Sequence, residues 1–135
     1  MKFTLIPPLI AKLKDHFPNR QFYVSGSGNA VIYPAAHAEV GDLEIHDEGG
    51  EITLYLGRFT HSHINNFGEK LSEEEDARKI VASIIAFLHD LFDDKVVLWG
   101  SQKGGGGTYR VGSVPNSAFP PRGPRYVWSG PYHAD

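Results

Sequence analysis

Two histidines separated by one residue, His61 and His63, form the group with the clearest ligand character in the 135-residue sequence. In an extended chain both imidazoles point to the same side, at a spacing that allows them to share one metal ion. A catalytic zinc ion usually has three protein ligands, so His46, Asp47 or a glutamate would have to complete the set after folding. Because the sequence marks none of these as the third ligand, His61 and His63 stay candidate metal ligands, and we expect no cofactor.

A polar patch for an anionic ligand is a second interpretation of the same segment. Arg58 precedes the histidines, and a guanidinium group binds carboxylates and phosphates with paired N–H groups. Tyr55 lies three residues before Arg58 and would add a hydroxyl group. A small enzyme, or a ligand- or metal-binding protein, that uses Arg58, His61 and His63 is therefore the alternative function that the sequence leaves open.

Familiar catalytic and nucleotide-binding motifs are absent from the sequence. There is no cysteine, which excludes a disulfide framework and a cysteine nucleophile, and no serine lies in a G-x-S-x-G motif. Residues 104–107 are glycines, but the strand-like residues 108–111 follow where a P-loop needs a lysine and a hydroxyl residue. Residues 26–28 lack the third glycine of a dinucleotide fingerprint. Both glycine segments predict hairpin turns, and an enzyme is the less favoured function.

The exposed face of a predicted hairpin carries strongly one-sided charge. Residues 42–46 and 51–56 alternate apolar and polar side chains, which is typical of strands with one buried and one exposed face. The side chains assigned to the exposed face and its turn include five carboxylates without a Lys or Arg: Asp42, Glu44, Asp47, Glu48 and Glu51. Such a face attracts a basic protein by electrostatic complementarity. The candidate partner-binding residues are therefore Asp42, Glu44 and Glu51, together with the C-terminal Trp128.

Two helices and about six strands are predicted around these groups. Residues 8–17 form a short helix, because apolar residues recur every four positions. Residues 73–92 form a long helix that begins with a capping box of Ser72 and Glu75 and has an apolar stripe wide enough to cover several strands. The strands are expected at residues 21–25, 30–33, 42–46, 51–56, 95–99 and 108–111.

This order of elements predicts an α+β fold. We expect a two-layer sandwich, in which one long helix and a short N-terminal helix cover a mainly antiparallel sheet. At the level of topology the order resembles small secretion-chaperone-like folds. Such a resemblance does not assign a function, because one fold supports many activities.

Composition divides the chain near residue 100. Residues 1–99 contain 15 acidic and 9 basic side chains, whereas residues 100–135 contain 1 acidic and 4 basic ones and 13 of the 24 Gly and Pro residues. Because the second hairpin extends to about Gly112, we expect one α+β domain over residues 1–112 and a Pro- and aromatic-rich extension over residues 113–135. The prolines disfavour regular structure in the extension. Its aromatic residues predict that it packs on the domain or, in a homodimer, on a partner subunit.

Charge and hydropathy limit the classes of function. The longest apolar runs are far shorter than the roughly 20 residues that span a bilayer, and no signal peptide is recognisable. The acidic body lacks the basic surface that nucleic-acid binding needs. We therefore expect a cytoplasmic protein that binds neither membranes nor nucleic acid. The favoured function is a non-catalytic protein-binding module, of the adaptor, chaperone-like or immunity type.

Overall fold

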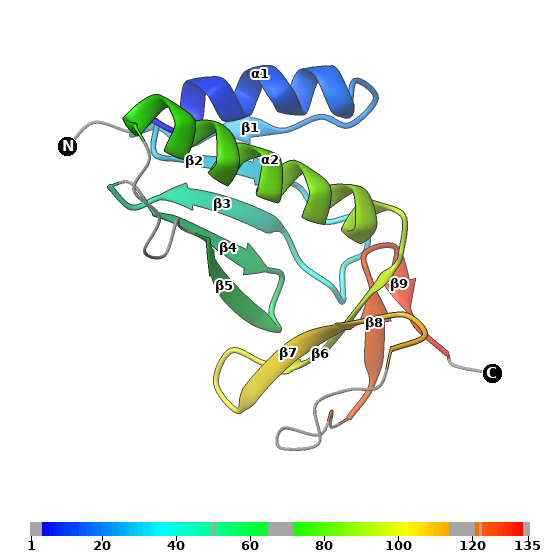
Figure 1. Cartoon of the computed structure of the whole chain (residues 1–135). Helices are drawn as coiled ribbons and strands as arrows, with labels where there is room; N and C mark the ends of the chain where they lie inside the picture. The colour runs from blue at the N-terminus through cyan, green and yellow to red at the C-terminus, as the bar shows by residue number, and fades with distance from the viewer. Residues whose placement is uncertain (1–3, 50, 65–71, 114–120, 122, 134–135) are drawn as a thin grey trace.

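The computed structural model describes residues 4–49, 51–64, 72–113, 121 and 123–133, and its fold is α+β, as the sequence predicts. The described residues form two antiparallel sheets, with strand orders β1-β2-β3-β4-β5 and β7-β6-β8-β9 (Figure 1). This gives more strands than the roughly six expected. The elements are α1 (Ile6–His16), β1 (Tyr23–Val24), β2 (Ala30–Tyr33), β3 (Leu43–Asp47), β4 (Ile52–Leu56), β5 (Thr60–Ile64), α2 (Glu73–Phe92), β6 (Val96–Ser101), β7 (Gly105–Arg110), β8 (Arg125–Val127) and β9 (Gly130–Pro131).

Both helices lie on one face of the first sheet, and the core lies between the two layers (Figure 1). In α1, Leu9 and Leu13 are one turn apart and both fully buried. The helix begins at Ile6, two residues earlier than predicted. The reason is a tertiary contact, in which the N–H of Leu5 donates to Oδ2 of Asp47 at 3.0 Å.

The long helix α2 has the predicted bounds. Oγ of Ser72 accepts a hydrogen bond from the N–H of Glu75 at 3.2 Å, so the predicted N-cap is confirmed. Four carboxylates in the first turn stabilise the helix, because they lie at the positive end of its dipole. One apolar stripe, from Ile80 to Phe92, faces the core. Although α2 is 20 residues long, neither described helix is apolar enough over its length to cross a bilayer.

The glycine run at residues 104–107, predicted as a hairpin turn, lies largely within strand β7. The turn between β6 and β7 is short, and the N–H of Gly104 donates to Oγ of Ser101 at 2.8 Å. Strand β7 already begins at Gly105, and Gly106 pairs with Gly100 of β6. A Cβ atom at Gly106 would lie 2.3 Å from the carbonyl oxygen of Phe59. The glycines therefore allow β7 to approach the end of the first sheet closely.

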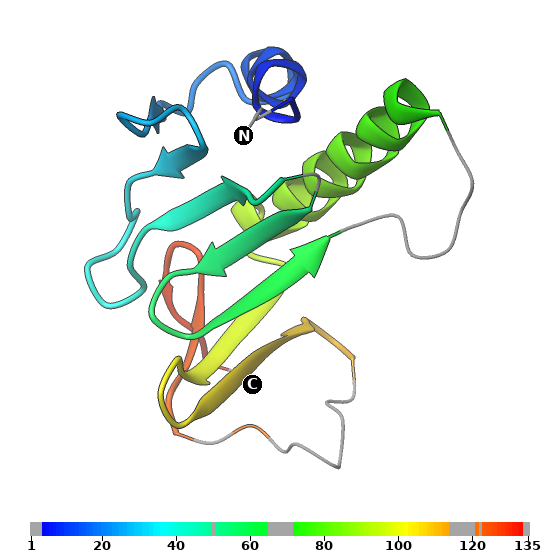
Figure 2. The ribbon, with the colours of Figure 1, turned by 90° about the vertical axis from the view of Figure 1, so that its left-hand side faces the viewer.

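The two sheets meet along β5. The N–H of Gln102 donates to the carbonyl oxygen of Arg58 at 3.0 Å, and its Nε2 donates to the carbonyl oxygen of Thr60 at 2.8 Å. Buried beneath this junction, the ring of Phe59 lies 5.3 Å from that of Tyr126 in the second sheet. Figure 2 shows the second sheet adjoining the first on the side of β5.

The described part of the C-terminal extension contributes two strands and a core side chain. Strand β8 pairs with β6 and with β9, so it is an inner strand of the second sheet. Pro131 lies in the edge strand β9, where its missing N–H removes no inner ladder bond. Trp128 follows β8, is 3% exposed, and its ring lies 5.5 Å from that of Phe92. Residues 114–120, which include two of the prolines, lie outside the described residues.

Replacing Tyr33 by phenylalanine is expected to remove a loss of stability at alkaline pH. The buried Tyr33 ring packs on Phe22 and Phe92, at centroid distances of 5.4 and 5.2 Å, and its hydroxyl has no hydrogen-bond partner among the described residues. Burial, against a smaller opposing effect of Arg20, raises the pKa of Tyr33 to about 12. Tyrosines of the unfolded chain ionise near pH 10. The contribution of neutral Tyr33 to the free energy of unfolding is therefore complete below about pH 10 and is lost as the pH rises towards 12.

Urea unfolding at neutral pH and at about pH 11 tests this expectation. Tyr33→Phe should be at least as stable as the wild type at neutral pH, because it removes a buried hydroxyl that lacks a partner. It should lose less stability on going to high pH. An equal alkaline loss in both proteins would contradict the role of Tyr33.

Candidate functional site

The segment that carries His61 and His63 is a strand, β5, which is not among the strands expected from sequence. Strand β5 pairs with β4, which places His61 opposite Tyr55 and His63 opposite Thr53. The two imidazoles therefore extend from the same side of β5, and their ring centroids are 5.3 Å apart.

Polar side chains of β3, β4 and β5 share the side of the first sheet that faces away from the helices. Because the strands are paired in register, residues directly opposite one another form rows across this side. We call this surface the β3–β5 face. It consists of a row of Glu44, Tyr55 and His61, a row of His46, Thr53 and His63, and the flanking Glu48 and Glu51.

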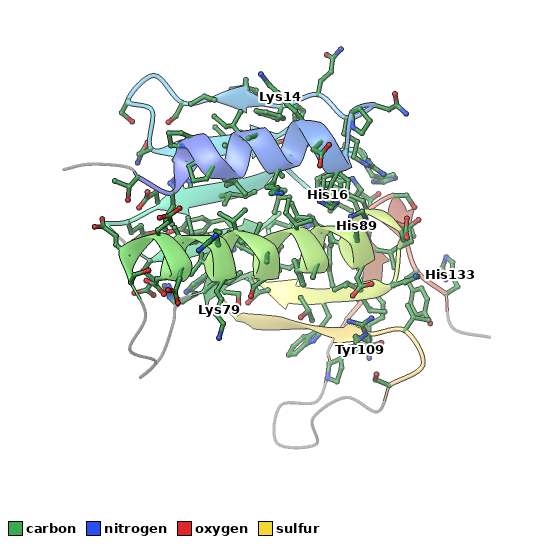
Figure 3. The ribbon with its side chains drawn as sticks, turned by 45° about the horizontal axis from the view of Figure 1, so that its top comes forward. Lys14, His16, Lys79, His89, Tyr109 and His133 are labelled. Atoms are coloured by element: carbon green, nitrogen blue, oxygen red, sulfur yellow. The ribbon has the colours of Figure 1, made fainter. Side chains whose placement is uncertain are left out.

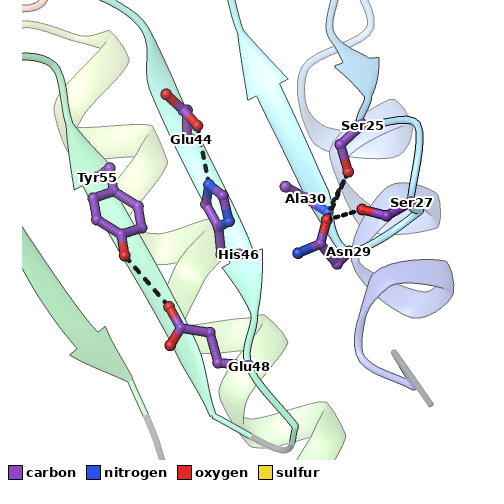
Figure 4. A network of polar contacts seen from close by, with 8 residues as sticks. All are labelled: Ser25, Ser27, Asn29, Ala30, Glu44, His46, Glu48 and Tyr55. Atoms are coloured by element: carbon purple, nitrogen blue, oxygen red, sulfur yellow. Dashed lines mark hydrogen bonds and ion pairs between the residues drawn. The ribbon is translucent and has the colours of Figure 1, made fainter. Parts of the chain in front are cut away.

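Two imidazoles of the β3–β5 face contact carboxylates. Nε2 of His46 lies 3.0 Å from Oε1 of Glu44 (Figure 4). Nδ1 of His63 lies 3.1 Å from Oε1 of Glu51 and 3.0 Å from Oγ1 of the buried Thr53. Both glutamate side chains are still 43% exposed. The contacts orient the carboxylates without removing them from solvent.

Tyr55 occupies the middle of the face. Its ring lies between those of His46 and His61, at centroid distances of 4.9 and 5.9 Å. Its hydroxyl donates to Oε1 of Glu48 at 3.5 Å (Figure 4). Partial burial raises the pKa of Tyr55, and the negative charges of Glu48 and Glu44 raise it further. The phenol is therefore protonated at neutral pH and lies in a negative electrostatic potential.

Arg58 is placed apart from the imidazoles with which it was grouped by sequence. Its guanidinium carbon lies 5.7 Å from the ring centroids of both Phe59 and Tyr126. The hydroxyl of Tyr126 donates to Oε2 of Glu39 at 2.6 Å, and this hydrogen bond is the main cause of a raised pKa of Tyr126. Arg58 lines a pocket of about 310 Å³ at the junction of the two sheets together with Ser101 and Tyr126. The predicted four-residue patch is therefore divided between the β3–β5 face and this pocket.

The other predicted partner-binding residues have different positions. Glu44 and Glu51 lie on the β3–β5 face. Oδ1 of Asp42 accepts a hydrogen bond from the N–H of Ala35 at 2.8 Å and stabilises the preceding loop. Asp47, assigned to the exposed face, is only 1% exposed and is directed towards α1. Trp128 is a core residue, so its ring is not available on the surface of this chain.

Several side chains in or beside the β3–β5 face were not singled out as binding residues by sequence. His46 was considered only as a third metal ligand, although its alternation with Glu44 already places both on one face. Thr53 is covered by its neighbours on the same face and has no distinguishing motif. Oε1 of Gln102 accepts a hydrogen bond from Nδ1 of His61 at 3.3 Å, and this contact depends on how the two sheets meet.

The β3–β5 face does not assemble a metal centre. Among the described residues, no three His, Asp or Glu side chains are grouped closely enough to hold one metal ion. The paired glutamates and imidazoles instead form an open, hydrogen-bonded surface of carboxylates around a tyrosine ring. This arrangement suits the recognition of a cation, because carboxylates form ion pairs and an aromatic ring attracts positive charge.

Comparison with known proteins finds no match for this chain among family models, curated proteins or solved structures. The geometry of the β3–β5 face is therefore the basis on which a function can be argued.

Proposed function

We propose that this protein is a non-catalytic protein-binding module that recognises a basic segment of a partner protein with its β3–β5 face. One observation carries the proposal: the half-buried ring of Tyr55 lies between Glu44, directly opposite on β3, and Glu48, which accepts its hydroxyl hydrogen bond. A lysine or arginine side chain placed on this ring would contact the π-face and both carboxylates. Glu51 adds a third carboxylate near His63.

The shape of the face favours a protein over a small molecule. Small-molecule sites are usually concave and enclose most of the ligand. The β3–β5 face extends over three adjacent strands, which are spaced by about 4.8 Å in a sheet, and its outermost side chain, His63, is 50% exposed. A surface of this kind can contact several side chains of an extended or helical segment at once.

Reversing the charge of the face is expected to abolish capture of basic partners. The test variant is Glu44→Lys/Glu51→Lys, and the control is Asp15→Lys/Asp93→Lys, which changes the net charge equally at exposed positions away from the face. Each protein is used as bait in an extract of the native host, and captured proteins are identified by mass spectrometry. Basic proteins bound by the wild type should be retained by the control and depleted at least about tenfold by the test variant.

A direct titration distinguishes specific binding at the β3–β5 face from general electrostatic attraction to an acidic protein. A short Lys- and Arg-rich peptide should shift the backbone NMR signals of β3, β4 and β5, and a Glu-rich peptide of equal length should not. Binding should weaken as salt is added, because the charges on this face are exposed. Partners retained undiminished by Glu44→Lys/Glu51→Lys, or signal shifts confined to the helices, would refute the proposed function.

A further inference from the structure

A groove with an apolar floor runs along the outer side of the two helices. Its volume is about 540 Å³. From α1 it is lined by Pro8, Lys12 and His16, which are spaced four residues apart and so lie on one stripe. From α2 the small side chains of Ala82 and Ala86, both exposed, lie at its floor. This groove faces away from the β3–β5 face and plays no part in the proposed function.

The helices run in the same direction along the groove (Figure 3). At their C-terminal ends Nδ1 of His16 lies 3.0 Å from Nε2 of His89. At their N-terminal ends a second hollow, of about 400 Å³, is lined by Leu5 of the α1 end and by Glu73 and Glu74 of α2. The two hollows therefore lie at different points along the same pair of helices, one at their N-terminal ends and the other along their middle and C-terminal parts.

Charge differs between the two hollows. Among the residues that the structure describes, the N-terminal hollow is lined by three carboxylates, Glu73, Glu74 and Asp76, and by no basic side chain. The charged and imidazole side chains that line the groove beyond it are Lys12, Arg78, His16 and His89, and no described carboxylate lies among them. Within the described part of the chain, neither Lys12 nor Glu74 has an ion-pair partner. Both charges are exposed and free to meet an opposite charge from another molecule.

We propose that a second copy of this chain docks on the α1–α2 surface, with a two-fold axis that makes the helices of the two copies antiparallel. A two-fold interface uses the same patch on both subunits, so that patch must be complementary to itself. Antiparallel packing places the acidic end of each copy against the basic groove of the other. The small side chains of Ala82 and Ala86 near the middle of α2 allow the helices of the two copies to approach closely. The result is a four-helix layer between the five-stranded sheets of the two copies.

A charge-swap experiment tests the dimer on the full-length chain. Sedimentation velocity and light scattering over a range of concentrations should show a monomer–dimer equilibrium for the wild type. Lys12→Glu and Glu74→Lys should each weaken self-association at least about tenfold, because like charges then meet twice across the axis. A mixture of the two variants should regain the dimer, since each contact again joins opposite charges. Lys14→Glu and Glu75→Lys, which change exposed residues outside both hollows, serve as matched controls.

A steric variant provides an independent readout. Ala82→Glu changes an exposed residue of the groove floor, and circular dichroism should show an unchanged fold with loss of the dimer. A wild type that stays monomeric at millimolar concentration would overturn the proposal and leave the groove to a helix of another protein. A dimer that is insensitive to Ala82→Glu, or a mixture of charge variants that fails to associate, would also overturn it. Loss of the proposed function of the β3–β5 face would affect none of these results.

Discussion

Replacing Trp128 by alanine is expected to lower the free energy of unfolding by about 3–5 kcal/mol. The indole is 3% exposed and belongs to the same buried cluster as α1, α2 and the first sheet. Its ring packs at a tilt against Phe92, whose ring also lies 5.1 Å from that of Phe17 and 5.2 Å from that of Tyr33. Removing the indole leaves a cavity beside this aromatic group, and neighbouring rings fixed by their own contacts cannot fill it fully. A loss of this size is a large fraction of the stability of a typical domain.

Urea unfolding followed by far-ultraviolet circular dichroism measures the effect of Trp128→Ala. Tyr23→Ala is the control, because it removes an aromatic side chain that is 54% exposed, and its effect should stay within about 0.5 kcal/mol. Trp128→Phe should recover part of the loss, since it refills part of the volume. If Trp128→Ala unfolded at the same urea concentration as the wild type, the residues after β8 would not contribute to the core as described.

Replacing Gly106 by alanine is expected to destabilise the protein by about 2–3 kcal/mol and to open the junction of the two sheets. The added Cβ would lie 2.3 Å from the carbonyl oxygen of Phe59 and 2.6 Å from that of Trp99. Both contacts are with backbone atoms, which cannot turn away as a flexible side chain can. Strand β7 must therefore move away from the first sheet, and the hydrogen bond from Gln102 to Arg58 is strained or lost.

Two measurements test the effect of Gly106→Ala. Unfolding by urea gives the change in stability, and hydrogen exchange of the Gln102 amide reports on the junction itself. Gly26→Ala is the matched control, because a Cβ there has no neighbour within 4 Å and the residue has no positive φ. An alanine at residue 106 that preserves both stability and slow exchange would show that the sheets are not as closely packed as their backbone distances indicate.

The elements that sequence predicts well are those whose stabilisation is local. Helix α2 has a cap at Ser72 and a regular apolar stripe, and both operate within the helix itself. The β3–β4 hairpin has strict alternation, so its buried and exposed faces follow from residue type. Alternation also places residue 47 with Leu43 and Ile45 on the buried face. The assignment of Asp47 to solvent was wrong because it followed the charge of the side chain rather than its position.

The elements that sequence misses depend on contacts distant along the chain. Strand β5 consists largely of polar residues, because it is at the edge of its sheet and its outer side is exposed. Strand β7 begins with three glycines, which have no side chains to show alternation and are needed only where backbones approach closely. Strand β8 is three residues long and follows a proline-rich segment, so only its pairing with β6 identifies it.

The candidate site divides in the same way. Glu44 and Tyr55 share a face by alternation within one hairpin, and this much follows from sequence. The neighbourhood of His61 and Tyr55 follows only from the pairing of β5 with β4. Arg58 precedes that strand, at the turn after Gly57. Its side chain lies instead at the junction with the second sheet, near the ring of Tyr126. Nearness in sequence therefore did not predict nearness in the site.

The hydrogen bond from Leu5 to Asp47 also bears on the order in which the chain acquires its structure during synthesis. Helix α1 is 11 residues long, and a helix of this length is marginal by itself in water. Its buried stripe has no surface to pack on until the first sheet forms, and the N–H of Leu5 has no carboxylate acceptor until residue 47 has been translated. Helix α1 is therefore stabilised only after β3 has followed it out of the ribosome.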